Sequence, residues 1–226
     1  MRSMGERLEE MPLFPLNTVL FPSAQLQLHV FEDRYREMVS YCTNNDLPFG
    51  VVLIRSGEEV GGTVEPYMVG TAVRIVSVHT FDDGKMDVIV QGERRFRVRR
   101  LEESRPYLVG YVEPVYESGI EDQARAEELA LRSREYIKAY VENYFARFQV
   151  IVSKFNLPPD PTELSFAVAN FLQIENLEKQ RLLETTDTIE RFEEMIPILE
   201  QHMVEAKSPD AHRVTKQHME EWIHPN

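Results

Sequence analysis

Residues 69–98 read VGTAVRIVSVHTFDDGKMDVIVQGERRFRV and carry the clearest strand pattern in the chain. Two alternating apolar runs flank the turn Asp82-Asp83-Gly84-Lys85, where the glycine supplies the positive φ that a tight hairpin needs. Gly92 interrupts the second run before the alternation resumes, as a bulge or a tight corner requires. We therefore expect a β-hairpin whose second arm bends at Gly92.

Stretches on both sides of this hairpin are also rich in Val, Ile, Phe and Tyr and are bounded by turn signals. Together they give six predicted strands, at 25–30, 48–55, 68–81, 86–92, 94–101 and 107–116. One amphipathic helix is expected over 32–45, because its apolar residues follow a three-four spacing. Six strands with bends suggest a closed or nearly closed barrel-like sheet.

The chain changes character at Glu121, where a long run of helix-forming residues without Gly or Pro begins. We expect this helix to end at Pro158-Pro159, because proline excludes its predecessor from the helical region and lacks a donor. Capping boxes at Asp160 and Asp187 open two further helices. The predicted layout is a leader (1–10), a β-rich barrel subdomain (11–117), a helical subdomain (118–206) and a C-terminal helix or tail (207–226).

Charge and cysteine content limit the possible classes of function. The 25 basic and 38 acidic residues give a formal net charge of −13, which repels phosphate backbones and anionic lipid. Cys42 is the only cysteine, so an internal disulfide is impossible and a reducing compartment fits best. No signal-peptide pattern is visible, and no stretch approaches the roughly 20 apolar residues of a membrane span. We expect a cytoplasmic protein that binds no membrane and is a poor candidate for nucleic-acid binding.

Three segments carry motifs in a characteristic order. MPLFPLNTVLFPSAQLQLHVFEDRY at 11–35 has a Pro-Leu-x-Pro-Leu strand, a Phe-Pro turn and a Leu-x-Leu strand. The 69–98 stretch has a Val-Gly-Thr segment, an Asp-Gly hairpin and a Gly-x-x-Arg-Phe strand. LEKQRLLETTDTIERFEEMIPIL at 177–199 has a Lys-Gln-x-Leu-Leu-Glu run before an Asp-containing cap. In these motifs and their order the chain resembles the Lon protease N-terminal (substrate-binding) domain family.

The resemblance implies an α+β fold, with a PUA-like mixed β pseudo-barrel followed by a C-terminal helical bundle. It also implies a non-catalytic module that binds unfolded or peptide segments of other proteins in protein quality control, with a separate ATPase or protease as a further partner. The ATPase and the Ser-Lys dyad of Lon lie in other domains, and this sequence has no G-x-x-x-x-G-K-[ST] motif. We therefore expect a stand-alone domain that is not an enzyme and needs no cofactor.

A protein-binding module needs exposed apolar area surrounded by polar residues. The candidate protein-binding residues are Phe21, Pro22, Leu26, Phe31 and Tyr35. Core packing is the competing interpretation for most of them. The Phe21-Pro22 loop is the place where exposed apolar surface is most expected.

The run Arg94–Arg100 supports an alternative function. Alternation along a strand places its apolar residues inward and Arg95, Arg97 and Arg99 outward, as a short basic stripe. Because PUA folds elsewhere bind RNA, these arginines are candidate polyanion-binding residues. Acidic residues flank the stripe, however, and no aromatic stacking platform accompanies it.

An unrecognised hydrolase is a third alternative with weaker support. The chain has no G-x-S-x-G elbow, and Ser153-Lys154 are adjacent in a helical run, where neighbours do not face each other. Cys42 lies on the apolar stripe of its helix, which favours packing over nucleophilic chemistry. Histidines at 212, 218 and 224 do not share a helix face, so we expect no metal site.

Overall fold

The computed structural model describes residues 8–146 and 156–206, and they form two compact units. The first unit runs up to Glu117 and includes Ile174–Thr186; the second consists of Ser118–Gln173 and the residues from Asp187 onward. The segment Ile174–Thr186 therefore groups with the strands, although it lies in the range predicted as a helical subdomain. The predicted tail, 207–226, lies outside the described residues.

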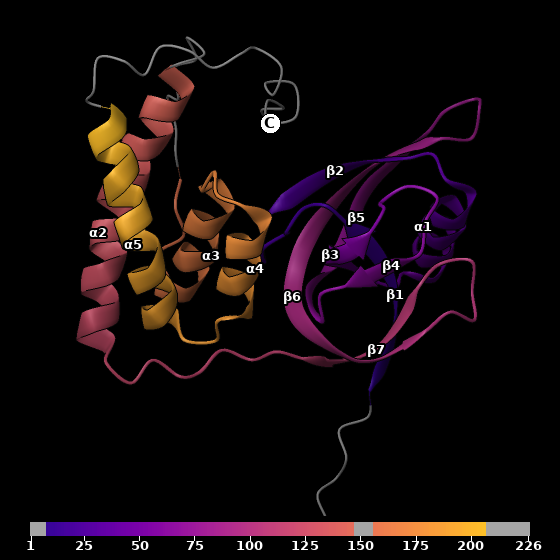
Figure 1. Ribbon diagram of the computed structural model, residues 1–226, viewed down its shortest axis with the longest axis horizontal. Helices are drawn as coiled ribbons and strands as arrows, with labels where there is room; N and C mark the ends of the chain where they lie inside the picture. Colours follow the sequence, from indigo (N-terminus) through magenta and orange to yellow (C-terminus); the bar gives the residue numbers. More distant parts are fainter. Residues whose placement is uncertain (1–7, 147–155, 207–226) are drawn as a thin grey trace, which may run out of the picture. The chain divides into compact units, whose positions relative to one another are not determined.

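The first unit is built on a mixed sheet. Its strands are β1 (Glu9–Leu16), β2 (Gln25–Val30), β3 (Phe49–Gly57), β4 (Val64–Pro66), β5 (Val69–Thr80), β6 (Met86–Glu102) and β7 (Val109–Pro114). They pair in the order β1-β7-β6-β5-β3-β4, and a parallel pairing of β1 with β3 closes five of them into a ring. β2 lies outside this ring, beside the first half of β6 (Figure 1). The barrel-like sheet is thus confirmed.

The hairpin around Gly84 forms as predicted. Gly84 has φ +80° in the turn, and β5 pairs antiparallel with β6 over most of its length. β6 continues through Gly92 as one strand, with a register shift against β5 at this point. A Cβ at Gly92 would lie 2.5 Å from the carbonyl oxygen of Phe21, so only glycine permits this close approach.

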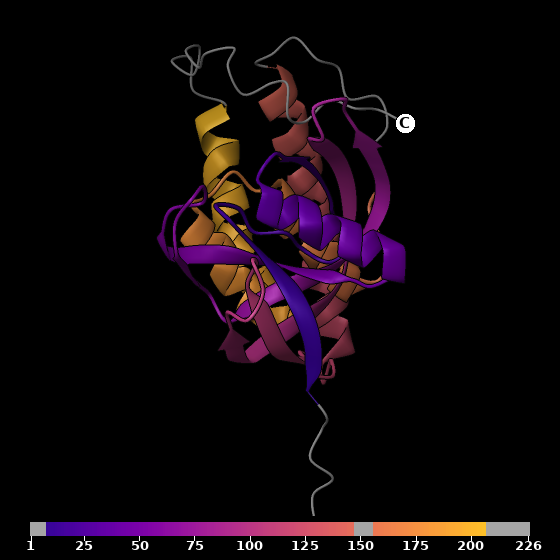
Figure 2. The same ribbon diagram turned by 90° about the vertical axis from the view of Figure 1, so that its right-hand side faces the viewer.

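Two helices belong to the same unit. α1 (Asp33–Asn45) buries Tyr35, Met38, Val39 and Cys42, the apolar face predicted from the sequence. It lies across the strands on the side turned to the viewer in Figure 2. α4 (Asn176–Glu184) packs near β5, where the Gln180 side-chain amide donates to the carbonyl of Val69 at 3.0 Å.

The second unit contains α2 (Gln123–Ala146), α3 (Pro161–Phe171) and α5 (Thr188–Ala206). The predicted caps form: Asp160 accepts from the Glu163 amide at 2.9 Å, and Asp187 accepts from the Glu190 amide at 3.1 Å. α2 packs against α5, and these helices are joined by arginine–glutamate pairs such as Arg132–Glu200 at 2.9 Å. Ser153-Lys154 lie outside the described residues.

Candidate functional site

The outer face of β2, β6 and β5 carries a row of polar side chains, with a histidine on either side of an aspartate. His29 on β2 and His79 on β5 are both paired with Asp87 on β6, so the three residues lie side by side across the sheet. His29 Nδ1 lies 2.8 Å from Asp87 Oδ1. Strand alternation turns these side chains away from the core, which is formed on the opposite face by residues such as Leu28 and Val88.

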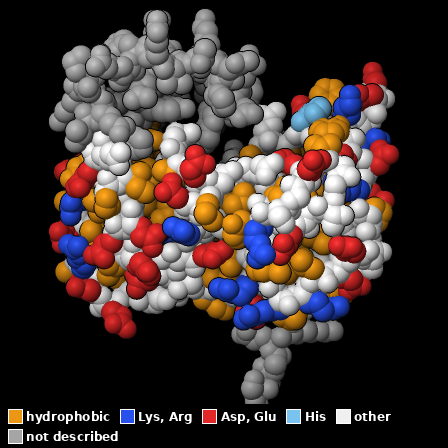
Figure 3. Space-filling model, viewed as in Figure 1, with side chains coloured by type: hydrophobic (Ala, Val, Ile, Leu, Met, Phe, Trp, Pro, Cys, Tyr) orange, Lys and Arg blue, Asp and Glu red, His pale blue; other side chains and the backbone are white. Residues whose placement is uncertain are grey.

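Exposed apolar side chains surround this row. Phe31, Phe81 and Ile89 are 45%, 40% and 37% exposed. The ring of Phe81 makes an edge contact with that of His79 at 4.7 Å between centroids, and the Phe31 ring lies 6.2 Å from that of His29. Figure 3 shows apolar and histidine side chains gathered at the end of the hairpin that β5 and β6 form. Phe31, Phe81, Ile89, His29 and His79 are called the hairpin patch below.

The structure separates the five predicted protein-binding residues. Phe31 is exposed, and Pro22 and Leu26 are half-buried. Phe21 and Tyr35 are 0% and 4% exposed, so the expectation that they offer a binding surface is wrong. Tyr35 lies on the inner stripe of α1 and stacks on Phe14 at 4.1 Å between ring centroids. Phe21 is fully buried, in line with the competing interpretation of core packing.

Sequence reasoning missed Phe81, Ile89 and the paired histidines of the hairpin patch. Phe81 lies directly before the Asp-Asp-Gly turn. Until the geometry of this turn was known, the sequence did not show on which face of the sheet the Phe81 side chain lies. Ile89 alternates with buried Val88 and Val90, which marks it as an outward-facing apolar residue on a strand. That departure from the usual polar outer face was the available signal.

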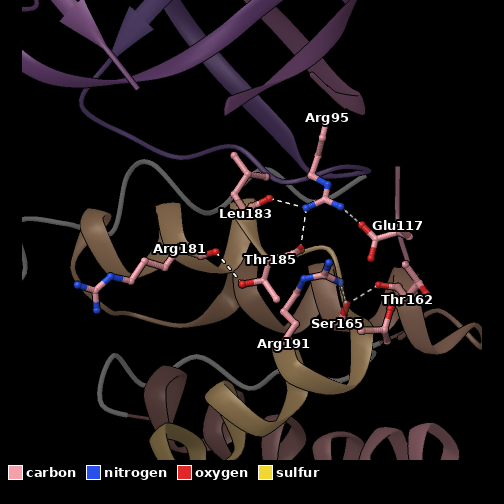
Figure 4. Close-up of polar contacts among 9 residues, drawn as sticks. Arg95, Glu117, Thr162, Ser165, Arg181, Leu183, Thr185 and Arg191 are labelled. Atoms are coloured by element: carbon pink, nitrogen blue, oxygen red, sulfur yellow. Dashed lines mark hydrogen bonds and ion pairs between the residues drawn. The ribbon is translucent and has the colours of Figure 1, made fainter. Parts of the chain in front are cut away.

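The predicted basic stripe is not an exposed cationic surface. Arg95 points away from the barrel as expected, but α4 lies on this side and leaves Arg95 only 3% exposed, so the prediction that it faces solvent is wrong. Its guanidinium donates to the carbonyls of Leu183 at 2.6 Å and Thr185 at 2.7 Å, and it pairs with Glu117 (Figure 4). Arg95 therefore supplies hydrogen-bond donors to two carbonyls at the C-terminal end of α4, which have no partner within the helix.

The other arginines of the stripe have acidic neighbours. Arg99 donates to Glu113 at 2.6 Å, and Arg97 is half-buried. The hydrogen bond from Arg99 lowers the pKa of Glu113, so this carboxylate stays charged and neutralises the arginine. Arg94 and Arg100 at the ends of the run pair likewise with Glu9 and Glu102. A surface on which most arginines are paired with glutamates has little net attraction for a polyanion, so the geometry does not favour RNA binding.

The described residues give little support to the hypothesis of a hydrolase. Burial raises the pKa of the Cys42 thiol to about 11, which keeps it protonated and unreactive near neutral pH. Neither His29 nor His79 is hydrogen-bonded to a serine hydroxyl or a thiol in ranges 8–146 and 156–206. In the same part of the chain, no three His, Cys, Asp or Glu side chains are grouped so that they could hold a metal ion.

Comparison with known proteins assigns the chain to a family. The model of the ATP-dependent protease La (LON) substrate-binding domain matches residues 10–201. The chain belongs to the Lon substrate-binding domain family. Lon protease of Anaeromyxobacter dehalogenans is 29% identical over 195 residues, and Lon protease 2 of Syntrophobacter fumaroxidans is 30% identical over 192. These matches cover 84% and 80% of this chain but 23% of each relative.

Solved structures agree with this assignment. The Lon N-terminal domain protein from Xanthomonas campestris has a TM-score of 0.62 and 27% identity, over 84% of this chain and 98% of that one. The N-terminal domain of Mycobacterium avium complex Lon protease, at 19% identity and a TM-score of 0.61 over 87% of this chain and 98% of its own, supports the fold alone. The Lon-type PUA-like fold predicted from the sequence is therefore confirmed.

Two residues of the motifs that the chain shares with this family have structural roles. Thr71 of the Val-Gly-Thr segment is fully buried and donates its hydroxyl to the carbonyl of Leu20 at 2.5 Å. Arg95 of the Gly-x-x-Arg-Phe strand holds the end of α4. These motif residues thus stabilise the fold of this Lon substrate-binding domain. Among the described helices, none combines the length and apolar character that crossing a bilayer requires.

Proposed function

We propose that this protein binds unfolded or peptide segments of other polypeptides, without covalent chemistry, through the hairpin patch. The observation that carries the proposal is the exposure of Phe31, Phe81 and Ile89 together on one sheet face. Large exposed aromatic residues lose much of their contact with water when a partner covers them, and they dominate the energetics of many interfaces. The paired strands beneath the patch hold these side chains in place before a partner arrives.

The polar residues of the patch suit this function. His29 and Asp87 are hydrogen-bonded beside the aromatic rings and form part of a polar rim around the apolar centre. Membership of the substrate-binding domain family supports the same proposal. Because the matched relatives are named Lon protease and extend well beyond the matched region, we further propose a separate ATPase or protease as a second partner.

Alanine substitutions of Phe31 and Phe81 test the binding surface. Each should weaken binding of a permanently unfolded client of basic charge, such as reduced and carboxamidomethylated lysozyme, by about tenfold or more, because an aromatic anchor is lost. Since both side chains are exposed, the free energy of unfolding should change by only about 0.5 kcal/mol. Affinities are measured by fluorescence anisotropy with a labelled client.

Tyr116→Ala is the matched control, because Tyr116 is an aromatic residue that is 71% exposed and follows β7, outside the patch. It should leave affinity unchanged. Native lysozyme should bind far more weakly than the unfolded form. Equal losses from all three alanine variants, or no loss from Phe31→Ala and Phe81→Ala, would show that the client binds elsewhere.

A further inference from the structure

We infer that the free edge of β2 receives the client as an added β-strand, through main-chain hydrogen bonds. This inference rests on the proposed function, and it specifies how the client is held. Within the described part of the chain, β2 pairs with β6 alone, so its other edge has no strand partner. An unpaired strand edge offers a row of N–H and C=O groups to an extended peptide.

The turn before β2 determines which main-chain groups point outward. The Ser23 amide donates to the Gly92 carbonyl and the Gly92 amide donates to the Ala24 carbonyl, each at 2.9 Å. Ser23 has φ 65°, so Ser23 and Ala24 form a bulge opposite Gly92. Hydrogen-bonded pairs alternate from this point in an antiparallel ladder.

This alternation assigns every residue of β2. Leu26, Leu28 and Val30 exchange hydrogen bonds with β6, because they follow Ala24 at two-residue steps. The N–H and C=O groups of Gln25, Gln27 and His29 therefore point to the free edge. The outward N–H and C=O groups of these three alternate residues can pair with one extended peptide segment.

β2 lacks the features that normally block a strand edge. QLQLHV at 25–30 contains no proline, glycine, lysine or acidic residue, although natural edge strands usually carry such groups to prevent pairing with other chains. Its side chains at 25, 27 and 29 are exposed. An edge without these blocking groups is suited to pairing with another chain.

The hairpin patch adds side-chain contacts to this edge. Phe31 follows directly after β2 and is 45% exposed, and Ile89 lies on the neighbouring strand β6. A strand added at β2 would place alternate side chains on the same outer face as Phe31 and Ile89. Because the protein carries a net charge of −13, the occupant that fits is an extended segment with alternating apolar residues and a neutral or basic charge.

Peptides methylated on main-chain nitrogens test this inference on the unaltered protein. The probe is a labelled Lys-Val-Thr-Val-Thr-Ile-Lys peptide, compared with two versions that are N-methylated at its odd or its even residues. A strand added at one edge uses only every second N–H of the peptide. One methylated version should therefore lose at least about tenfold in affinity, and the other should bind within about threefold of the parent.

Two changes in the protein provide an independent readout. Gln27→Pro removes an N–H that points to the free edge and leaves the bonds to β6 intact, so it should fold and lose at least about tenfold in peptide affinity. Gln27→Ala keeps the N–H and should bind normally. In amide hydrogen exchange, Gln25, Gln27 and His29 should exchange quickly in the free protein and become protected when the parent peptide binds.

The outcomes separate the mode of binding from the function itself. Equal effects of both methylation patterns, with binding of the parent peptide and of the unfolded client preserved, would overturn strand addition and leave the proposed function standing. Failure of both the parent peptide and the unfolded client to bind would overturn both. If Gln27→Pro does not fold, the methylated peptides and the exchange of the three amides still decide the result.

Discussion

Replacing Arg95 with methionine is expected to lower the free energy of unfolding by about 3–5 kcal/mol, because it removes a buried cation and leaves its acidic partner without the ion pair. Methionine keeps much of the aliphatic volume but donates no hydrogen bond. The carbonyls of Leu183 and Thr185 would lose their guanidinium donor, and Glu117 would lose its ion-pair partner. Denaturation with urea, followed by circular dichroism, measures the loss.

Arg99→Met is the matched control for this prediction. Arg99 lies on the same strand and pairs with Glu113, but its side chain is 53% exposed. A solvent-exposed ion pair contributes about 1 kcal/mol or less, so this variant should remain close to the parent protein. If Arg95→Met and Arg99→Met have the same small effect, Arg95 does not stabilise α4 in the way described.

Gly70→Ala is expected to cost about 3 kcal/mol of stability, at the upper end of the usual effect of overpacking. A Cβ at this position would lie 2.4 Å from the carbonyl oxygen of Val51 and 2.9 Å from the Phe96 ring. The carbonyl belongs to the neighbouring strand β3, so relief requires the backbone of the closed ring to move. Urea denaturation measures this loss as well.

Gly119→Ala provides the comparison, because no heavy atom lies within 4 Å of the added methyl group and the backbone there has no positive φ. This variant should change the free energy of unfolding by about 0.5 kcal/mol or less. A cost below about 1 kcal/mol for Gly70→Ala would mean that β3 and β5 can separate easily at this point. The closed ring would then be less tightly constrained than its pairing indicates.

Most of the fold could be predicted from local patterns. The Asp-Asp-Gly turn, the amphipathic spacing of α1 and the caps at Asp160 and Asp187 depend on nearby residues, and all of them form. β1 was expected only from the family resemblance, because Pro12 and Pro15 weaken its strand pattern. The ring closure between β1 and β3 is a long-range pairing that no local spacing reveals.

The candidate site was harder to predict because exposure depends on distant packing. Arg95 has the sequence pattern of an outward-facing residue, yet a helix about 90 positions later in the chain covers it. Phe31 and Phe81 come from different elements and join one patch only through the pairing of β2, β6 and β5. An apolar residue in a single sequence does not reveal whether it is core or binding surface.

Nuclear magnetic resonance mapping of an unfolded client tests the central claim most directly. Titration of reduced and carboxamidomethylated lysozyme into the 15N-labelled protein should shift the amide signals of residues 25–31 and 79–89, and should leave those of α2 and α5 nearly unchanged. Binding that shifts signals in α2 and α5 while the signals of β2 and the hairpin stay fixed would contradict the assignment of the hairpin patch as the polypeptide-binding surface.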